Sequence, residues 1–426
     1  MVWGPPMRAS VFGSDLRGVA AVGLACLFFG YGFLLRVSPA VMVNELMREF
    51  AVGAALLGNL SAIYLYIYAA MQIPIGAMLD ALGTRWLLAV ACLTVAAGSY
   101  IFAGAETLGT AYIGRFLIGI GCAFSWPGLL AIVGQRFPTR FAMLGGIGQV
   151  AGMAGGVLAQ APLAAVVAAS GWRATMASLA LVGVVLAVCV ALVTRDRRRP
   201  VVNAVRPATN IRGVLRNPQV WWAALFGLAM TGPLLAFAGL WGVPFIMTTY
   251  GVERTIAASS ISLVFVGSAV GALFLGWCSD RMQRRKPVML AGSVLCATML
   301  MIVVYVPRMP LAVLSAAVFF LGVGSSSLLL AFAVGREHSQ SVTAGRAIGI
   351  INMAVVGSGA LFQPIIGILL DTQWNGRLLD GARVYSAENY RLAMLVLPVA
   401  AAAGILALWR IKETYCRQRP DGTSTA

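Results

Sequence analysis

Residues 76–85 read Gly-Ala-Met-Leu-Asp-Ala-Leu-Gly-Thr-Arg, a short polar break between two long apolar runs. A related stretch follows 200 residues later, where residues 276–285 read Gly-Trp-Cys-Ser-Asp-Arg-Met-Gln-Arg-Arg. The first glycine, the aspartate and the final arginine occupy the same places in both copies. This recurrence predicts an internal duplication, with one copy of the break in each half of the chain.

The duplication extends well beyond this break. Gly119 recurs as Gly322 and Gln160 as Gln363, both 203 residues further on. Halves related by duplication are typical of secondary transporters, whose substrate site lies near the bilayer midplane between the halves.

The composition is that of a membrane protein. Of the 426 residues, 60% are hydrophobic and 11% are charged, and the mean hydropathy is +0.87. A soluble domain has roughly 45–50% apolar and about 25% charged residues. These values exclude an ordinary soluble enzyme, a disordered chain and a nucleic-acid-binding module.

Twelve apolar runs are long enough to cross a bilayer as helices, which need about 20 residues each. We therefore predict an all-α polytopic membrane protein with twelve transmembrane helices in two six-helix bundles. The predicted spans are residues 18–43, 55–79, 85–105, 108–134, 142–169, 173–194, 219–248, 257–278, 287–306, 310–334, 347–370 and 390–411.

Basic residues set the predicted orientation. With the N-terminus inside, and with residues at span ends counted with the nearer side, 22 of the 31 lysines and arginines are cytoplasmic, 7 are outside and two lie in the interior of spans. This satisfies the positive-inside rule, so we expect both termini to be cytoplasmic and the membrane to be a bacterial inner membrane. The rule also accounts for the net charge of +17 without a nucleic-acid partner.

The longest cytoplasmic connection is rich in arginine and proline and separates six spans from six spans. It divides the chain into a predicted N-terminal bundle, linker, C-terminal bundle and cytoplasmic tail, at residues 1–194, 195–218, 219–411 and 412–426. We expect a monomer in the lipid bilayer.

Two parts of the sequence resemble known groups of transporters. The break at residues 76–85, with its degenerate copy at 276–285, resembles the signature loop of the major facilitator superfamily. Residues 33–42 and 60–74 are also similar to the phagosomal nutrient transporters of intracellular bacteria, which import amino acids and related nutrients. The first resemblance implies that the loop latches the cytoplasmic side while the carrier faces outward. The latch residues would be Gly76, Asp80, Gly83, Arg85 and Asp280.

Two arginines lie inside predicted spans, Arg36 in the first and Arg115 in the fourth. A charge at such depth costs at least about 2.5 kcal/mol unless it finds a partner or reaches the interface. No aspartate or glutamate lies in the middle of a span, and the single histidine, His338, is in a loop. A substrate carboxylate is therefore the expected partner, because a guanidinium matches its geometry. The alternatives are snorkelling and hydrogen bonds to backbone carbonyls.

Arg115 also resembles the arginine motif of the superfamily's fourth helix, although Ile118 replaces the usual glutamine. The absence of a core acid argues against a conventional proton relay and leaves the coupling ion open. Met153 stands where antiporters of the superfamily have a proline, which weakens the case for efflux.

Uncharged polar residues complete the predicted site. Tyr64, Tyr68 and Gln72 follow one another at helical spacing, which places them on one stripe of the second span. Four amides in the fifth and eleventh spans need buried partners, which would be the substrate or another helix. These amides are Gln149, Gln160, Asn352 and Gln363. Trp126 and Trp241 each lie next to a helix breaker and are candidate gate or cavity aromatics, with packing as the alternative.

The predicted function is transport by alternating access, importing a small carboxylate-bearing nutrient such as an amino acid, a short peptide or an organic anion. The alternatives are an efflux antiporter for drug-like or siderophore-like compounds, and a non-transporting sensor or scaffold with a carrier fold. We predict no enzyme activity, cofactor or metal, because the sequence has no phosphate loop, redox fingerprint or nucleophile–base set.

Overall fold

The computed structural model describes residues 16–195, 211–306, 309–340, 343–379 and 381–417. Inside these ranges, the side chains of residues 73, 76, 77, 80, 142, 211 and 212 are outside the description. The first half comprises α1 (Leu16–Val37), η1 (Ser38–Val41), α2 (Val43–Glu49), α3 (Ala54–Leu82), α4 (Arg85–Ala103), α5 (Leu108–Ala123), α6 (Ser125–Arg136), η2 (Pro138–Arg140), α7 (Phe141–Leu158) and α8 (Ala161–Val193). The second comprises α9 (Ile211–Leu215), α10 (Pro218–Gly232), η3 (Pro233–Trp241), α11 (Gly242–Tyr250), α12 (Arg254–Met282), α13 (Lys286–Tyr305), α14 (Leu311–Ser325), α15 (Leu328–Glu337), α16 (Ala344–Thr372), β1 (Leu378–Leu379), β2 (Ala382–Arg383), α17 (Ala387–Met394) and α18 (Val396–Arg410).

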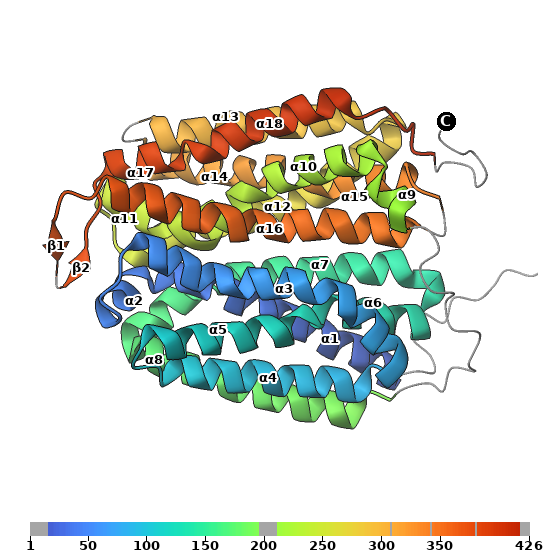
Figure 1. Cartoon of the computed structure of the whole chain (residues 1–426), viewed down its shortest axis with the longest axis horizontal. Coiled ribbons are helices and arrows are strands. Elements are labelled where there is room, and N and C mark those ends of the chain that lie inside the picture. Colours follow the sequence, from blue (N-terminus) through green and yellow to red (C-terminus); the bar gives the residue numbers. More distant parts are fainter. Residues whose placement is uncertain (1–15, 196–210, 307–308, 341–342, 380, 418–426) are drawn as a thin grey trace, which may run out of the picture.

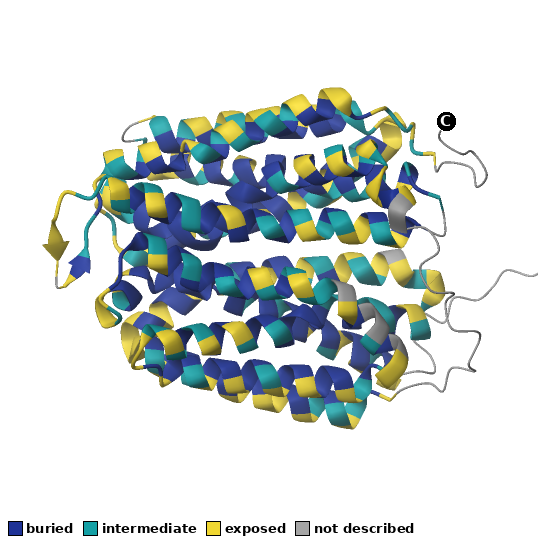
Figure 2. Ribbon diagram, in the orientation of Figure 1, coloured by how far each residue is buried: buried dark blue, intermediate teal, exposed yellow. Residues whose placement is uncertain are grey.

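The helices form two bundles that pack in the same pattern (Figure 1). Helix α1 packs on α7 as α10 packs on α16, α3 on α5 as α12 on α14, and α4 on α8 as α13 on α18. The bundles meet mainly where α3 contacts α16 and where α12 contacts α7. Inward helix faces are buried and many large apolar side chains on the outward faces are exposed, as expected of helices surrounded by lipid (Figure 2).

The prediction of an all-α polytopic membrane protein is confirmed. In the described ranges, eleven helical stretches are long and apolar enough to span a membrane, and the shorter apolar helix at Met143–Leu158 supplies another crossing. The predicted fifth span differs in detail, because the chain leaves helical geometry at Gln160. Gly171, with a φ of +78°, kinks α8 between the fifth and sixth crossings. Left-handed backbone of this kind favours glycine.

The seventh crossing contains a wide helical segment. Residues Pro233–Trp241 form the π-helix η3 between α10 and α11. Pro233 has no N–H to donate to the preceding turn, and such widened turns free backbone carbonyls for other donors. This segment packs against η1 and α16, where the two bundles meet.

The two ends of the molecule differ. The hairpin end carries α2 and the antiparallel strands β1 and β2, with Leu378 opposite Arg383. The linker end carries α9 and the described end of the tail at residue 417 (Figure 1). The linker predicted at 195–218 contains α9, and the predicted domain boundaries otherwise stay predictions.

Candidate functional site

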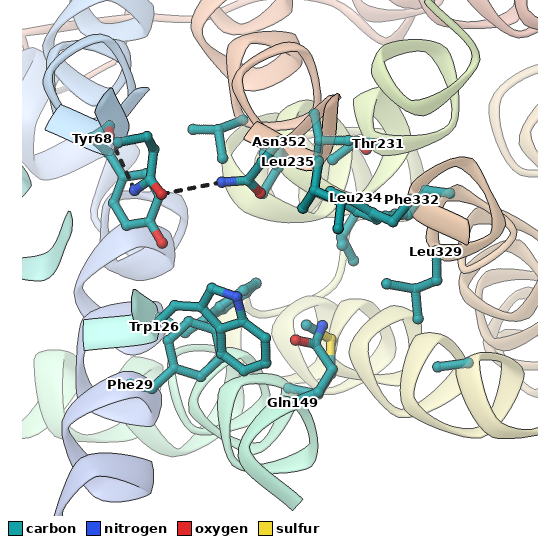
Figure 3. A pocket seen from close by; sticks show the side chains of 18 of the residues that line it. Phe29, Tyr68, Trp126, Gln149, Thr231, Leu234, Leu235, Leu329, Phe332 and Asn352 are labelled. Atoms are coloured by element: carbon teal, nitrogen blue, oxygen red, sulfur yellow. Dashed lines mark hydrogen bonds between the residues drawn. The ribbon is translucent and has the colours of Figure 1, made fainter. Parts of the chain in front are cut away.

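A cavity of about 510 Å³ lies between the two bundles. Its lining reaches the linker end at Gly345, in the first turn of α16. Figure 3 shows Phe29 and Trp126 on one side, with Gln149 facing Asn352 across the open space. The residues that line the cavity include Phe29, Phe33, Arg36, Tyr68, Gln72, Trp126, Gln149, Met153, Thr231, Leu234, Leu235, Ser268, Ser326, Leu329, Phe332 and Asn352.

Arg36, in the last turn of α1, lines the cavity and is 8% exposed. Its guanidinium lies over the rings of Phe33 and Tyr68, with its central carbon 4.7 Å from each ring centroid. Its Nε atom has no hydrogen-bond partner, and no carboxylate of the described residues pairs with it. Arg36 is thus a buried cation held by aromatic faces, with hydrogen-bonding capacity left for an anion.

Arg115 lies behind the cavity wall, because it is 1% exposed and is absent from the lining. Its Nη1 donates to the carbonyl of Leu35 at 2.7 Å and its Nη2 to that of Ser61 at 3.3 Å. These contacts correspond to the backbone-carbonyl alternative and tie α5 to α1 and α3. This position favours a structural role for Arg115, and its predicted contact with substrate is not tested by it.

The polar stripe of the second span is split between two layers. The Tyr64 hydroxyl donates to the carbonyl of Gly32 at 3.1 Å, and its buried ring stacks on Tyr68 with the centroids 6.0 Å apart. Tyr68 and Gln72 line the cavity, whereas Tyr64 supports Tyr68 from behind. Gln72 accepts a 3.4 Å hydrogen bond from Asn352, which joins the two bundles across the cavity (Figure 3).

The four predicted amides also divide into two pairs. Gln149 and Asn352 line the cavity, and their contact with a substrate stays a prediction. Gln160 and Gln363 are buried outside the lining and donate to carbonyls of η3, those of Ala238 at 2.9 Å and Leu235 at 2.8 Å. This second pair makes hydrogen bonds between helices, which was the alternative to substrate contact. The π-helix η3 supplies the carbonyl acceptors.

The two tryptophans have different positions. Trp126 lines the cavity with its ring 4.9 Å from that of Phe29. Trp241 is fully buried, and its Nε1 donates to the carbonyl of Gln363 at 3.0 Å. Trp241 therefore packs the closed part of the interface, and Trp126 alone faces the cavity.

Sequence reasoning missed much of the aromatic lining. Phe29, Phe33 and Arg36 follow at +4 and +3, so helical spacing could have placed all three on one face of the first span. Phe332, Thr231 and Ser268 carry no comparable signal, because each reaches the cavity only through the packing of its own helix.

The hairpin end is closed by polar contacts between the bundles, which the sequence analysis also missed. Asp371, near the end of α16, accepts hydrogen bonds from the backbone N–H groups of Ala54 at 3.1 Å and Ala55 at 2.9 Å. The same carboxylate binds Arg383 and the Tyr385 hydroxyl. It thus caps the N-terminus of α3 from the opposite bundle, where a negative charge is favourable. A second ion pair joins Glu45 of α2 to Arg254 of α12.

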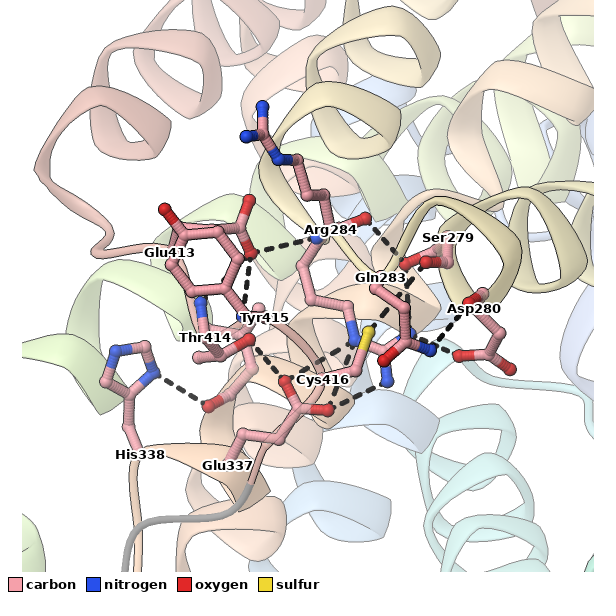
Figure 4. A network of polar contacts seen from close by, with 12 residues as sticks. Ser279, Asp280, Gln283, Arg284, Glu337, His338, Glu413, Thr414, Tyr415 and Cys416 are labelled. Atoms are coloured by element: carbon pink, nitrogen blue, oxygen red, sulfur yellow. Dashed lines mark hydrogen bonds and ion pairs between the residues drawn. The ribbon is translucent and has the colours of Figure 1, made fainter.

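At the linker end, the second copy of the predicted latch forms a network (Figure 4). Arg285 pairs with Asp280 at 2.7 Å and with Glu337 at 2.8 Å. Burial lowers the pKa of Arg285, but its bonds to Glu337 and Asp280 outweigh burial and raise it. Glu413 of the tail accepts hydrogen bonds from the N–H groups of Arg285 and Lys286, both at 2.9 Å, and thereby caps α13.

The first copy of the latch is described only in part. The surroundings of Gly76 and the side chain of Asp80 are outside the description. Gly83 ends α3 with a φ of +78°, which favours glycine, and Arg85 donates to the carbonyl of Ala191 at 2.7 Å. The latch role predicted for Gly76, Asp80, Gly83 and Arg85 stays a prediction.

The network around Glu413 predicts an acid-sensitive tail. Burial alone would raise the pKa of Glu413, but the backbone N–H groups around it outweigh burial and lower it. A carboxyl with a lowered pKa stabilises the folded state above its ordinary value of 4.5, and this contribution is lost as the pH falls further. We expect the protection of residues 413–417 against hydrogen exchange, measured relative to the intrinsic rate at each pH, to fall below about pH 4.5, and Glu413→Gln to lower it at pH 7. Glu388→Gln, which changes an exposed carboxylate, is the control. Unchanged exchange in Glu413→Gln would show that Glu413 does not hold the tail in place.

In the described part of the chain, no group of three or more His, Cys, Asp or Glu side chains is placed to hold a metal ion.

Residues 20–243 and 234–424 match the family model of the Major Facilitator Superfamily. The chain is 24% identical to a probable L-galactonate transporter of Escherichia coli over 95% of this chain and 91% of that protein. It is also 24% identical to a gentisate transporter of Corynebacterium glutamicum, over 85% and 84% of the two chains.

The fold also resembles solved structures. A bacterial homolog of the human lysosomal transporter Spinster, in an inward-facing and occupied conformation, superposes with a TM-score of 0.78 at 18% identity. The match covers 96% of this chain and all of that one.

Proposed function

Because this chain belongs to the Major Facilitator Superfamily and is therefore a membrane transporter rather than an enzyme, we propose that it imports small carboxylate-bearing solutes. The observation that carries the proposal is Arg36, a buried cation in the cavity that pairs with no carboxylate of the described residues. A buried charge without a partner is costly, and a substrate carboxylate would supply the partner.

The rest of the lining suits the body of such a solute. Phe29, Phe33 and Trp126 offer aromatic faces, and Gln149 and Asn352 offer amide groups on opposite sides. Cavities of this kind bind ligands through apolar walls and a few placed polar groups. The named solutes of the two relatives, L-galactonate and gentisate, both carry a carboxylate, which supports the same class of substrate.

The orientation of the chain decides which end of the cavity would face the cytoplasm. The basic residues favour a cytoplasmic linker end, which supports a bacterial inner-membrane protein with both termini on the cytoplasmic side. The closed hairpin end then faces outward, and the cavity is reached from the cytoplasm, as in an inward-facing state of alternating access. We propose that a monomer works in this way.

Thermal unfolding of the purified protein with a panel of solutes tests the proposal. The panel is gentisate, L-galactonate, L-leucine and tetraphenylphosphonium, each measured with the unmodified protein and with Arg36→Met. A ligand that binds only the folded protein stabilises it by about 2.7 kcal/mol at a concentration of 100 times its Kd. We expect the carboxylates to raise the melting temperature of the unmodified protein and to have no effect on the variant.

Two results would overturn the proposal. One is stabilisation by tetraphenylphosphonium alone, which would favour the efflux alternative. The other is an equal shift by carboxylates in Arg36→Met, which would place the anion site elsewhere.

A further inference from the structure

The cavity carries one charged side chain. Among the described residues that line it, Arg36 is charged and no aspartate, glutamate or histidine is present. His338, the single histidine of the sequence, lies at the linker end, where its ring contacts the Val334 carbonyl. The described lining of the cavity therefore provides a fixed positive charge and no ordinary acceptor for a transported proton.

The acids of the chain lie away from this charge. The described acids at the hairpin end are Glu45, Glu49, Glu106, Glu253, Asp371 and Glu388, and those at the linker end are Asp280, Glu337 and Glu413. The remaining acids of the sequence, Asp15, Asp80, Asp196, Asp380 and Asp421, have side chains outside the described part and fall outside the predicted spans. None of the described acids therefore stands where it could share a proton with a solute bound to Arg36, and the other five are not in the predicted spans.

The groups that face Arg36 neither gain nor lose a proton near neutral pH. Its neighbours are the rings of Phe33, Tyr64 and Tyr68, with the Cys122 thiol nearby and the Arg115 guanidinium beyond Tyr64. Phenols and thiols ordinarily ionise near pH 10 and about pH 8.5, and guanidinium stays protonated. Changing the pH between 5 and 7 therefore leaves the charge of this cluster unchanged.

We propose that the protein is an anion exchanger, in which one carboxylate enters as another leaves and no proton is carried with either. The inference rests on the proposed carboxylate site at Arg36. In the inward-facing state Arg36 is 8% exposed and lines a cavity that reaches Gly345, so water can still contact its guanidinium. Closing both ends around an empty site would remove this remaining water and leave the charge without a partner, whereas a bound carboxylate neutralises it. The loaded carrier therefore reorients readily and the empty carrier does not.

Transport by purified protein in liposomes tests this inference, with labelled gentisate and labelled L-galactonate as probes. Liposomes contain either the unlabelled probe or buffer of equal ionic strength, and pyranine in the lumen reports pH. Liposomes carrying Arg36→Met provide the background for passive entry of the acid. We expect the internal anion to accelerate uptake of the label at least 10-fold. An imposed pH gradient should alter uptake less than 2-fold, and the lumen should not acidify during exchange.

The outcomes separate the inference from the proposed function. Arg36-dependent uptake that is equally fast without an internal anion and acidifies the lumen would overturn exchange in favour of proton symport, and leave the carboxylate site intact. No Arg36-dependent uptake of either probe under any condition, with no thermal shift by any carboxylate, would overturn the proposed function and exchange together. Exchange that is fast only with an internal anion supports both.

Discussion

Replacing Arg36 with methionine is expected to reduce carboxylate uptake by about 30-fold or more, while the protein still folds and inserts. Truncating one partner of a buried, hydrogen-bonded charge pair costs about 2–5 kcal/mol, and each 1.4 kcal/mol is tenfold in affinity. In the free protein the Arg36 side chain contacts aromatic rings and makes no ion pair with a described residue. Its removal therefore leaves no buried carboxylate without a partner, and the melting temperature should be unchanged or higher. Uptake by proteoliposomes and thermal unfolding measure the two effects.

Arg115→Met is the matched control for this result. Arg115 is buried to a similar degree, but it donates to the carbonyls of Leu35 and Ser61, which would lose their partner. Hydrogen bonds from charged groups contribute about 1.5–3 kcal/mol each, so we expect this variant to unfold at a lower temperature. If Arg36→Met transports normally, or if it loses stability as Arg115→Met does, the assignment of Arg36 to the substrate is wrong.

Replacing Asp371 with alanine is expected to open the hairpin end. The carboxylate accepts from Ala54 and Ala55 across the bundle interface and also binds Arg383 and Tyr385. Burial and the bond to Asp371 raise the pKa of Tyr385, so the phenol stays protonated and donates. When the bundles separate here, the hydrogen bonds that cross the interface are lost to water. These hydrogen bonds therefore favour the state in which the hairpin end is closed. Two charged hydrogen bonds contribute about 3 kcal/mol, which corresponds to roughly a 100-fold shift of the equilibrium.

A cysteine at Val41 reports this opening. Val41 is 1% exposed in η1, which packs on η3 at the hairpin end. We expect a membrane-impermeant maleimide, added from outside to right-side-out vesicles, to label Val41→Cys at least 10-fold faster when Asp371→Ala is also present. Glu388→Ala, which removes an exposed carboxylate at the same end, should leave the rate unchanged. Equal labelling with and without Asp371 would show that the carboxylate does not hold this end closed. Labelling of the protein that keeps Val41 measures the background from native cysteines.

Several parts of the fold followed from the sequence because their causes are local. Apolar runs of sufficient length predict the membrane crossings, and the recurrence of Gly76, Asp80 and Arg85 as Gly276, Asp280 and Arg285 predicts two related halves. The fifth crossing was harder to predict. Residues 142–169 form one continuous apolar run, but the backbone leaves helical geometry at Gln160, whose side chain binds a carbonyl of the other bundle.

The candidate site could be predicted only in part. The absence of acids from the predicted spans singled out Arg36 and Arg115, because a charge in a membrane needs an explanation. The sequence could not rank them, since both arginines are surrounded by apolar residues. The structure separates them by the position of each guanidinium, at the cavity for Arg36 and against two backbone carbonyls for Arg115.

The sequence by itself determined the class of protein, the duplicated architecture and the presence of uncompensated positive charge in the membrane. These properties depend on composition, on the lengths of apolar runs and on the spacing of residues along one chain. Only the tertiary structure decided which polar residues face the cavity and which end is closed. Asp371 and Ala54 are 317 residues apart, and no local pattern encodes a contact that arises when two separate bundles pack together.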